Sequence, residues 1–359
     1  MNKQRPLPMG LSMGVIIVFV SMLLGVCFLI VFLYNLPVIF PPPESNPRVV
    51  GIATLPPNSP SPRPPATLTP VISGPENTPS PTPGITPSPS PAVAAVQGRI
   101  VFVTERNGFN SIFVMNADGS GQHSLVPHKG NYYDYAPAVS PDGRRLAFSS
   151  NREKPGTDNI YLLNMDGTNL IEITATPNAK NASSSWFPDG RRLAFSSNRS
   201  GRWQPYTMND DGTGVRQVIT SNEDVINVAV SPDGGMLAYI CGREICLANA
   251  DGSNPHILLK NGLPKDHLAW SPDSSQLAFT QGNPNTARTS VYVLDLQGNT
   301  RRIADNGGWP SWSPEGTKII FSSDMGGVAN LYLHNLDTGQ VKQLTSTRAA
   351  DYTPVWMRQ

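Results

Sequence analysis

One phrase recurs five times between residues 140 and 316 of this 359-residue chain, and it constrains the fold more than any other feature. The copies are SPDGRRLAFSS from Ser140, FPDGRRLAFSS from Phe187, SPDGGMLAYI from Ser231, SPDSSQLAFT from Ser271 and SPEGTKIIFSS from Ser313. Their prolines are 47, 44, 40 and 42 residues apart. Self-similarity at this period indicates an array of equivalent units, and units made of several short strands are the blades of a propeller.

Each unit predicts four short strands. In the second unit the innermost strand covers 138–140, and Pro141-Asp142-Gly143 supplies the fixed φ, the local acceptor and the permissive position of a turn. The rest of that unit reads as a strand from Leu146, a polar loop over 151–158, a strand over 160–163, a hairpin at 165–168 and a strand over 170–174. No segment carries apolar residues at helical spacing over ten or more positions, which excludes helical repeats. The predicted fold class is therefore all-β, with four-stranded antiparallel blades.

The two ends of the repeat region predict six blades over 97–359. The first unit, which starts at Arg99, matches only the second and third strands of a blade. The segment Thr353-Pro354-Val355-Trp356 matches the innermost strand of a further unit that then stops. Joining both ends in one blade closes the ring and leaves no open sheet edge between its first and last units.

The repeated pattern resembles a known family. The run P-x-W-S-P-D-G-x-x-[IL]-A-F-x-S-x-R, followed by I-Y-x-x-N-x-D-G, is similar to the PD40 or WD40-like repeat of TolB-type six-bladed propellers. It covers roughly three quarters of the chain in five or six copies, and the GH and WD dipeptides of true WD40 repeats are missing. The resemblance implies a periplasmic propeller that binds a lipoprotein partner at its mouth. We expect no TolB-type α/β domain before the propeller, so only the architecture and a general binding role carry over.

An uncharged apolar segment precedes the propeller. Residues 11–36 contain no charge, and 26 residues at about 1.5 Å each exceed the roughly 30 Å hydrocarbon core of a bilayer. Lys3 and Arg5 precede this segment, and Glu44 is the first charge after it. The positive-inside rule then predicts a cytoplasmic N-terminus over 1–10, one transmembrane helix, and a propeller on the outer side of the cell membrane. A cleaved signal peptide is the alternative, although the run is long for one and no A-x-A site follows closely.

A proline-rich linker over 37–96 is expected between the helix and the propeller. Residues 41–96 hold half of the chain's 36 prolines and only four charged residues. This composition lacks the apolar mass that would offset the entropy of ordering, so the linker is predicted to be a disordered, extended spacer. In polyproline II geometry, at about 3.1 Å per residue, it reaches on the order of 170 Å.

Composition excludes some partners and leaves the cysteines open. With 27 basic and 26 acidic residues, the chain lacks the concentrated basic face that nucleic acid binding needs. Cys241 and Cys246 are the two cysteines beyond the apolar segment. A two-residue turn at Arg243-Glu244 would place them opposite each other, where an oxidising compartment forms a disulfide. A longer turn would break this register and leave two free thiols.

No catalytic motif is evident. The nucleophile elbow G-x-S-x-G is missing, and the five histidines fall at unrelated blade positions without metal-ligand spacing. We therefore expect no enzyme activity, no cofactor and no bound metal. The repeated N-x-D-G-[ST] segments lack the ligand series of a calcium loop and are interpreted as turns. A tryptophan at one shared repeat position is interpreted as core between blades, at Trp186, Trp270, Trp312 and Trp356.

The face of the propeller that varies between repeats is the place to search for a site. The PDG and DG turns lie at one end of each blade and are near-identical, whereas the loops at the other end differ. Aromatic and arginine side chains dominate recognition hot spots. The candidate ligand-binding residues on the variable face are Tyr132, Tyr133, Asp134, Tyr135, Arg202, Trp203, His267, Trp309, Asp351 and Tyr352. The last four are expected just before innermost strands, near the channel mouth.

Two functions of different classes follow. The favoured one is a non-catalytic, membrane-tethered, extracytoplasmic scaffold that presents its variable face to a protein, a peptide or a cell-wall glycan. The alternative is a propeller enzyme of the lyase or lactonase type that acts on a sugar or polysaccharide and holds a metal near the channel. Fold analogy by itself does not name the ligand.

Overall fold

The computed structural model describes residues 98–127, 130–283 and 288–357 of the chain. The predicted cytoplasmic segment, transmembrane helix and linker lie outside these residues. Within the described ranges, no helix is long and apolar enough to span a bilayer.

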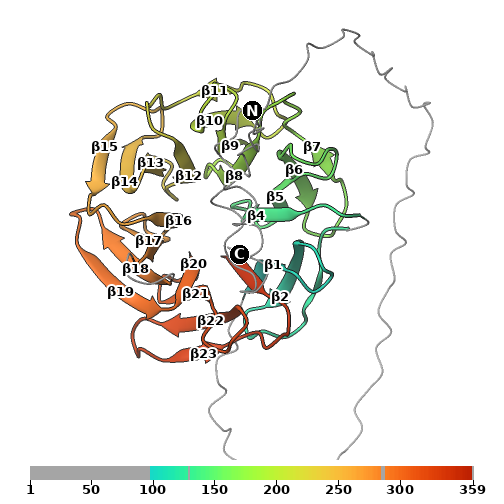
Figure 1. Ribbon diagram of the computed structural model, residues 1–359, viewed down its shortest axis with the longest axis vertical. Helices are drawn as coiled ribbons and strands as arrows, with labels where there is room; N and C mark the ends of the chain where they lie inside the picture. The colour runs from blue at the N-terminus through green and yellow to red at the C-terminus, as the bar shows by residue number, and fades with distance from the viewer. Residues whose placement is uncertain (1–97, 128–129, 284–287, 358–359) are drawn as a thin grey trace, which may run out of the picture. The chain divides into compact units, whose positions relative to one another are not determined.

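The described residues form six antiparallel sheets of four strands each, arranged as blades in a ring (Figure 1). Blade 1 consists of β24 (Asp351–Trp356), β1 (Arg99–Thr104), β2 (Ser111–Asn116) and β3 (His123–Ser124). Blade 2 consists of β4 (Asp134–Val139), β5 (Arg145–Ser150), β6 (Asn159–Asn164) and β7 (Ile171–Glu172). Blade 3 consists of β8 (Asn181–Trp186), β9 (Arg192–Ser197), β10 (Gln204–Asn209) and β11 (Arg216–Gln217).

The other three blades follow in chain order. Blade 4 consists of β12 (Val225–Val230), β13 (Met236–Cys241), β14 (Glu244–Asn249) and β15 (His256–Leu259). Blade 5 consists of β16 (Lys265–Trp270), β17 (Gln276–Gly282), β18 (Thr289–Asp295) and β19 (Thr300–Asp305). Blade 6 consists of β20 (Gly307–Trp312), β21 (Lys318–Ser323), β22 (Asn330–Asn335) and β23 (Val341–Gln343). The first strand named in each blade is the innermost, next to the ring axis (Figure 1).

The two middle strands of each blade carry the core. The phenylalanine of the repeated LAF segment is fully buried, as at Phe148, where the opposite residue on the next strand is Tyr161. Their ring centroids lie 5.8 Å apart in a stacked arrangement. Aromatic pairs directly opposite each other on neighbouring strands stabilise a sheet. Equivalent pairs occur at Phe102–Phe113, Phe195–Tyr206, Phe279–Tyr292 and Phe321–Tyr332.

The ring closes as predicted. Strand β24 pairs antiparallel with β1, with Ile100 opposite Trp356 and Thr104 opposite Asp351. The last strand of the chain thus supplies the innermost strand of the blade that the first strands begin. This pairing satisfies the backbone groups that would otherwise form an open edge at β1.

The four repeat-position tryptophans are core, as predicted. Each is no more than 7% exposed and packs in a cluster formed with the neighbouring blade. The indole of Trp186 donates to the Ala138 carbonyl of the preceding blade at 3.0 Å, and Trp270 and Trp312 donate in the same way at 3.1 Å. The indoles of Trp186, Trp270 and Trp312 thus join their own blades to the preceding ones, and all four tryptophan side chains are committed to the core.

The predicted strand limits need two corrections. The innermost strand of blade 2 covers Asp134–Val139 and not 138–140, because the turn-side end alone carries the recognisable repeat. The outermost strand covers only Ile171–Glu172, where five residues were predicted. That strand lies at the sheet edge with both residues exposed, so it has a partner on one side only. The 151–158 loop and the strand after it are as predicted.

The cysteine hairpin differs from the predicted register. The turn is formed by Gly242 and Arg243, with Gly242 at φ +62°, so Cys241 lies opposite Glu244 and Cys246 lies opposite Tyr239. Glycine takes this positive φ without steric cost, which decides the turn position. The structure contains a disulfide between Cys241 and Cys246, across diagonal positions with Cα atoms 6.1 Å apart. The predicted turn at Arg243-Glu244 is therefore wrong, although the two sulfurs are joined.

The repeated SPDG turns are built on a carboxylate. Ser140 Oγ donates to Asp142 Oδ1 at 2.6 Å, and the Arg145 amide donates to Ser140 Oγ at 2.9 Å. The hydrogen bond from the serine is the main reason that the pKa of Asp142 lies below its usual value, and Asp233 and Asp273 have lowered pKa values for the same reason. The N-x-D-G-[ST] segments are turns, as predicted: the carboxylate of Asp166 accepts from the amide and hydroxyl of Thr168.

These carboxylates predict acid sensitivity. A folded-state pKa below the unfolded value of about 4 contributes stability above that value and loses it as the pH falls through the folded pKa. We expect the urea midpoint to fall between about pH 5 and pH 2 as the turn carboxylates become protonated. The triple variant Ser140→Ala, Ser231→Ala, Ser271→Ala removes the main cause at three turns, so its midpoint should change less over this range. An identical pH dependence in both proteins would contradict the assignment.

Candidate functional site

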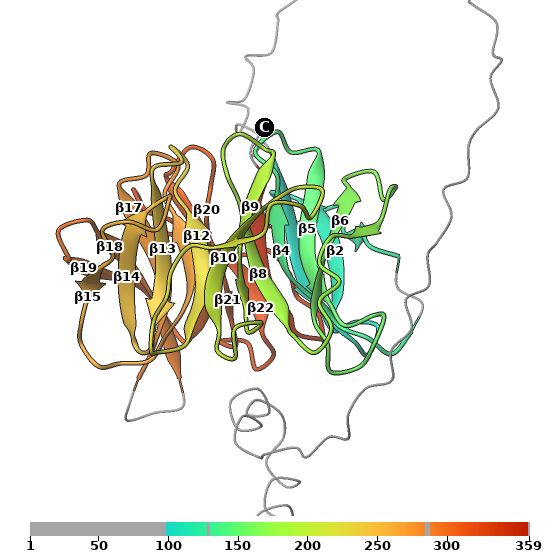
Figure 2. The same cartoon turned by 90° about the horizontal axis from the view of Figure 1, so that it is seen from above.

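The ring has two chemically different faces. The turn face carries the SPDG and N-x-D-G-[ST] turns, and the loop face carries the loops between second and third strands and the connections between blades (Figure 2). Each innermost strand runs from the loop face to the turn face. Strand β1, which follows Gly98, begins at the turn face, and β24 ends there.

A cavity of about 290 Å³ runs along the ring axis. Innermost strands of all six blades line it, from the loop-face side at His267 and Trp309 to the turn-face side at Pro141 and Pro272. The channel mouth, as used below, is the loop-face end of this cavity. The cavity is close to the lower end of the volumes that ligand pockets occupy, roughly 300 to 1,000 Å³.

A β-bulge in every innermost strand shapes the mouth. The pairing between each innermost strand and its neighbour shifts register near the third residue. That residue has a positive φ in all six blades and lines the cavity. The six residues, here called the bulge ring, are Ala136, Ser183, Asn227, His267, Trp309 and Thr353, with φ between 44° and 54°. A bulge re-aims a side chain, and here it directs one residue per blade toward the axis.

The bulge ring holds residues that are poorly suited to its backbone. Asparagine and histidine tolerate the left-handed region, but β-branched or bulky residues such as threonine and tryptophan are genuine outliers there. Trp309 has φ +53° and Thr353 has φ +44°. Such residues cost stability and cluster at functional sites. The identity of the bulge-ring side chains therefore points to a role at the channel mouth.

Polar groups of three neighbouring blades are linked on one side of the mouth. Ser183 Oγ donates to Asn227 Oδ1 at 3.1 Å, and Asn227 Nδ2 donates in turn to Asp266 Oδ1. The same Asp266 oxygen accepts the His267 amide at 2.9 Å. The second oxygen, Oδ2, lies 3.0 Å from His267 Nδ1 as an ionic contact without hydrogen-bond alignment.

Asp266 is ionised in this setting. Burial among the surrounding protein groups would by itself raise the pKa of Asp266. The neighbouring His267, through its ring and its backbone amide, and the hydrogen bond from Asn227 outweigh this effect, so the pKa lies below the usual value. The Asp266 side chain is nevertheless 49% exposed, beside the cavity-lining residues Asn227 and His267. A ligand can therefore reach part of this carboxylate, while the dense protein surroundings strengthen its charge interactions.

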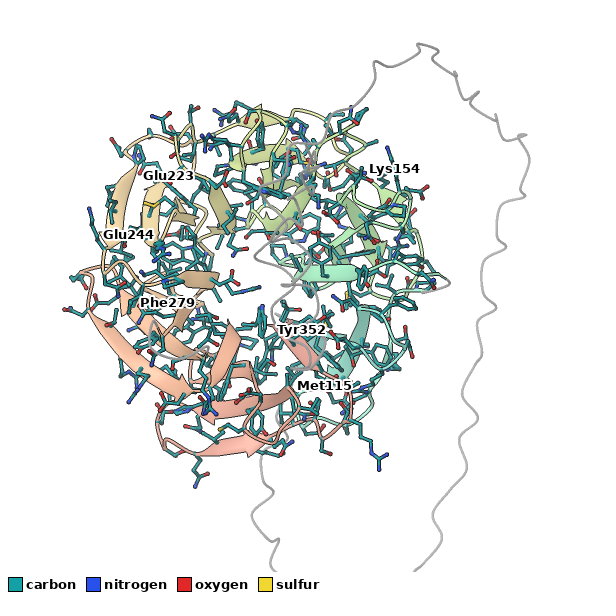
Figure 3. All side chains as sticks on the ribbon, in the orientation of Figure 1. Met115, Lys154, Glu223, Glu244, Phe279 and Tyr352 are labelled. Atoms are coloured by element: carbon teal, nitrogen blue, oxygen red, sulfur yellow. A yellow bond between two sulfur atoms is a disulfide. The ribbon has the colours of Figure 1, made fainter. Side chains whose placement is uncertain are left out.

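Three aromatic rings continue around the mouth on the next blades. The His267 and Trp309 centroids lie 5.4 Å apart, and those of Trp309 and Tyr352 lie 5.6 Å apart. Figure 3 shows Tyr352 close to the ring axis. We call His267, Trp309 and Tyr352 the aromatic row. Its backbone is anchored, since the Trp309 amide donates to Thr280 Oγ1 at 2.9 Å.

A second carboxylate stands at the far end of the aromatic row. The Tyr352 hydroxyl donates to Glu105 Oε1 at 3.3 Å. Burial raises the pKa of Tyr352 first of all, and the negative charge of Glu105 adds to this, so the hydroxyl stays protonated. Tyr133 interacts electrostatically with Tyr352 and packs edge-on against Phe109, with centroids 6.1 Å apart. Tyr133 is 46% exposed and extends the aromatic surface away from the axis.

The structure brings together only some of the predicted site residues. His267, Trp309 and Tyr352 form the aromatic row, but they lie inside β16, β20 and β24 and not before them as predicted, because the innermost strands begin earlier. Tyr132 does not line the cavity; its hydroxyl donates to the Pro127 carbonyl, and its ring faces Arg152. Tyr135 is a half-buried residue of β4.

Asp134 and Asp351 are buried structural residues and not exposed ligand contacts. Both have no exposed surface, and each forms an ion pair with an arginine that follows the second strand of the same blade. Arg152 contacts both oxygens of Asp134 at 2.9 and 3.0 Å and lies over the Phe148 ring. The equivalent Arg106 lies 2.9 Å from Asp351. Because both carboxylates are buried and paired with arginines, they are not exposed to a ligand as predicted.

Arg202 and Trp203 lie away from the cavity. They belong to the loop between β9 and β10, and neither is among the residues that line the channel. The Trp203 amide donates to Asp224 Oδ1 at 3.1 Å, within the same part of the loop face. The structure therefore does not join them to the aromatic row.

Sequence reasoning missed four residues of the mouth. These are Ser183, Asn227, Asp266 and Glu105. An alignment of the repeats by their SPDG turns would have found the first three, because they lie at or beside one repeat position whose residue type differs in every blade. Among the described residues, no group of three or more His, Cys, Asp or Glu side chains is placed to hold a metal ion. The metal-dependent enzyme stays an alternative that elemental analysis of the purified protein can test.

Comparison with known proteins places these features in one family. Residues 77–245 and 242–359 match the family described as PD40, TolB beta propeller domain. The Tol-Pal system protein TolB of Bordetella pertussis is 30% identical over 154 residues, which cover 29% of this chain and 35% of that protein. The TolB homolog of Chlorobium luteolum is 28% identical over 144 residues, which cover 40% of this chain and 31% of that protein. The matches thus span about a third of the length of these relatives.

Solved structures agree on the fold. TolB from Acinetobacter baumannii superimposes with a TM-score of 0.63 at 20% identity and covers 74% of this chain and 67% of its own. A putative TolB from Agrobacterium tumefaciens has a TM-score of 0.55, also at 20% identity, and covers 73% of this chain and 99% of its own. At this level of identity, the likeness concerns the fold.

Proposed function

Because this chain belongs to the TolB beta-propeller (PD40) family, we propose that it is a non-catalytic scaffold that binds a protein partner at the channel mouth of its loop face. The observation that carries this proposal is the bulge ring. Trp309 occupies a left-handed backbone position that disfavours so bulky a side chain, and it lines the mouth together with His267. Strain of this kind is retained where the side chain has a use.

The aromatic row supports a protein as the ligand. The Trp309 and Tyr352 rings pack against each other at a tilt at the mouth, and Tyr133 lies exposed next to them. Tryptophan and tyrosine bury a large area on binding and carry a polar group, which makes them frequent anchors in protein interfaces. The name of the Bordetella pertussis relative assigns that protein to a Tol-Pal system, in keeping with an assembly partner and not a small substrate.

The proposed scaffold is tethered to the cell membrane with its propeller on the outer side. This part of the proposal rests on the uncharged run over 11–36 and the preceding Lys3 and Arg5. The chain enters the propeller at Gly98, beside the start of β1 on the turn face.

We expect protease added to intact cells to release the propeller and to leave the N-terminal segment protected. The physical reason is that 11–36 crosses the bilayer and 37–96 is exposed outside it. Immunoblots with one tag before Lys3 and another after Gln359 measure the two fragments, and lysed cells serve as the control in which both are digested. A soluble protein that begins after residue 40 would instead show a cleaved signal peptide.

A further inference from the structure

Carboxylates flank both ends of the aromatic row. At one end Asp266 Oδ2 lies 3.0 Å from His267 Nδ1, and at the other Glu105 Oε1 lies 3.3 Å from the Tyr352 hydroxyl. Between them, the three ring centroids are spaced by 5.4 and 5.6 Å. Aromatic faces attract cations through the ring quadrupole, and a nearby carboxylate adds direct charge attraction.

Most cations near this part of the ring already have partners. Arg106 is paired with the buried Asp351, and Arg152 is paired with the buried Asp134. Within the described residues, no lysine or arginine forms an ion pair with Asp266 or Glu105, and the imidazole of His267 lies beside Asp266 on the same strand. The mouth therefore presents negative charge that the protein's own basic residues do not neutralise.

The Asp266 carboxylate is preorganised to receive a cation. One oxygen, Oδ1, accepts both the Asn227 amide and the His267 backbone amide, which fixes the orientation of the group. The other oxygen, Oδ2, has only the contact with His267 Nδ1, and about half of the side chain remains exposed. Its lowered pKa keeps it charged under neutral conditions. A fixed, ionised and reachable carboxylate beside aromatic faces is the chemistry of an ammonium or guanidinium site.

We propose that the channel mouth selects a basic side chain, lysine or arginine, which the partner lays along the aromatic row with its charged head at Asp266. This inference rests on the proposed function and adds the chemical class of the anchor. The stem of such a side chain packs on the Trp309 and Tyr352 rings while its head meets Asp266. Glu105 at the far end extends the same negative potential and favours a partner segment of net positive charge.

The test screens a library of random heptapeptides displayed on phage against the full-length chain, which is immobilised through its N-terminal end. Three proteins are compared: the wild type, Asp266→Asn at the mouth, and Asp211→Asn on the turn face as the matched change of charge. Binding of each enriched peptide to Trp309→Asn then measures whether it requires Trp309. Asparagine at 266 keeps the acceptor for Asn227 and for the His267 amide. Thermal melting checks that all three proteins are folded, and Glu105→Gln provides a second mouth variant if Asp266→Asn melts early.

The wild type and Asp211→Asn should enrich peptides with lysine or arginine at one fixed position, and Asp266→Asn should not. In the best such peptide, replacing that residue by norleucine removes the charge and keeps the stem. We expect this replacement to weaken binding about tenfold to the wild type but less than about twofold to Asp266→Asn, because the interaction it removes is already lost there.

Different failures contradict different statements. If peptides bind the wild type in a way that requires Trp309 but carry no basic residue, the cation inference is wrong and the proposed binding face stands. The same conclusion follows if the norleucine replacement weakens peptide binding to Asp266→Asn as much as it weakens binding to the wild type. If no enriched peptide needs Trp309 for binding, both the inference and the proposed function are overturned. Both are also overturned if only a neutral cell-wall glycan binds.

Discussion

Deletion of residues 351–359 should lower the melting temperature of the propeller by more than about 10 °C or prevent its folding. The deletion removes β24, so the backbone of β1 loses its partner from Ile100 to Thr104. It also removes Trp356, which packs with Ile100, Phe102 and Leu333 between the first and last blades. Loss of one buried tryptophan costs about 3 to 5 kcal/mol, against a total stability of roughly 5 to 15 kcal/mol.

Two controls separate closure from chain length. Deleting only 358–359 should leave the melting temperature unchanged, because β24 ends at Trp356. Trp356→Ala keeps the strand and removes the core side chain. The fall in its melting temperature should therefore lie between the falls caused by the two deletions. The measurement is thermal unfolding by far-ultraviolet circular dichroism. A melting temperature of the long deletion equal to that of the wild type would rule out the closure between β24 and β1.

The double variant Tyr133→Ala, Trp309→Ala should weaken capture of the partner by more than about 2 kcal/mol, or roughly 30-fold in Kd. Trp309 is in the bulge ring and in the aromatic row, and Tyr133 is the exposed aromatic residue that interacts with Tyr352 beside it. Hot spots of this size are typical of tryptophan and tyrosine near the centre of an interface. Isothermal titration with the partner, or with the best peptide ligand of the mouth, measures the change.

Trp309→Asn distinguishes binding from packing. Asparagine suits the left-handed backbone, and Asn227 already occupies the same repeat position in blade 4. We therefore expect this variant to bind as weakly as Trp309→Ala while its melting temperature stays at or above that of the wild type. Paired alanine substitutions at Asp166 and Asp211 on the turn face should leave binding intact. Equal losses from both faces, or a large loss of stability with Trp309→Asn, would mean that Trp309 is a packing residue.

The parts of the fold that depend on local sequence could be predicted. The serine, proline, aspartate and glycine of each SPDG turn act within five residues, as the contacts of Ser140 with Asp142 and Arg145 show. The number of repeats, with the partial units at both ends, gives the number of blades. The unpaired strand pattern at 353–356 indicates closure of the ring. Local chemistry did not fix the strand ends: outermost strands such as Ile171–Glu172 are limited by their one-sided pairing.

The candidate site could be predicted by face but not by residue. Aromatic enrichment pointed to His267, Trp309 and Tyr352 as candidates, and the structure brings their rings together. Asp134 and Asp351 were equally good candidates in the sequence. In the structure, arginines just after the neighbouring strands hold both carboxylates in buried ion pairs. Whether an aspartate is a structural partner or an open charge depends on what lies across the sheet, and spacing along the chain does not contain that information.

The sequence by itself determined that this protein is a closed ring of six similar blades, because turns and strand patterns are local and repeat with the chain. Only the tertiary structure decided what stands at the ring axis. The bulge ring joins residues that are about 40 to 50 positions apart, and the channel mouth exists only after six blades have closed around it. The lowered pKa of Asp266 likewise comes from His267, which the bulge turns toward the carboxylate, and from Asn227 on another blade. Charge and access are properties of the assembled surroundings, which is why they became visible only in three dimensions.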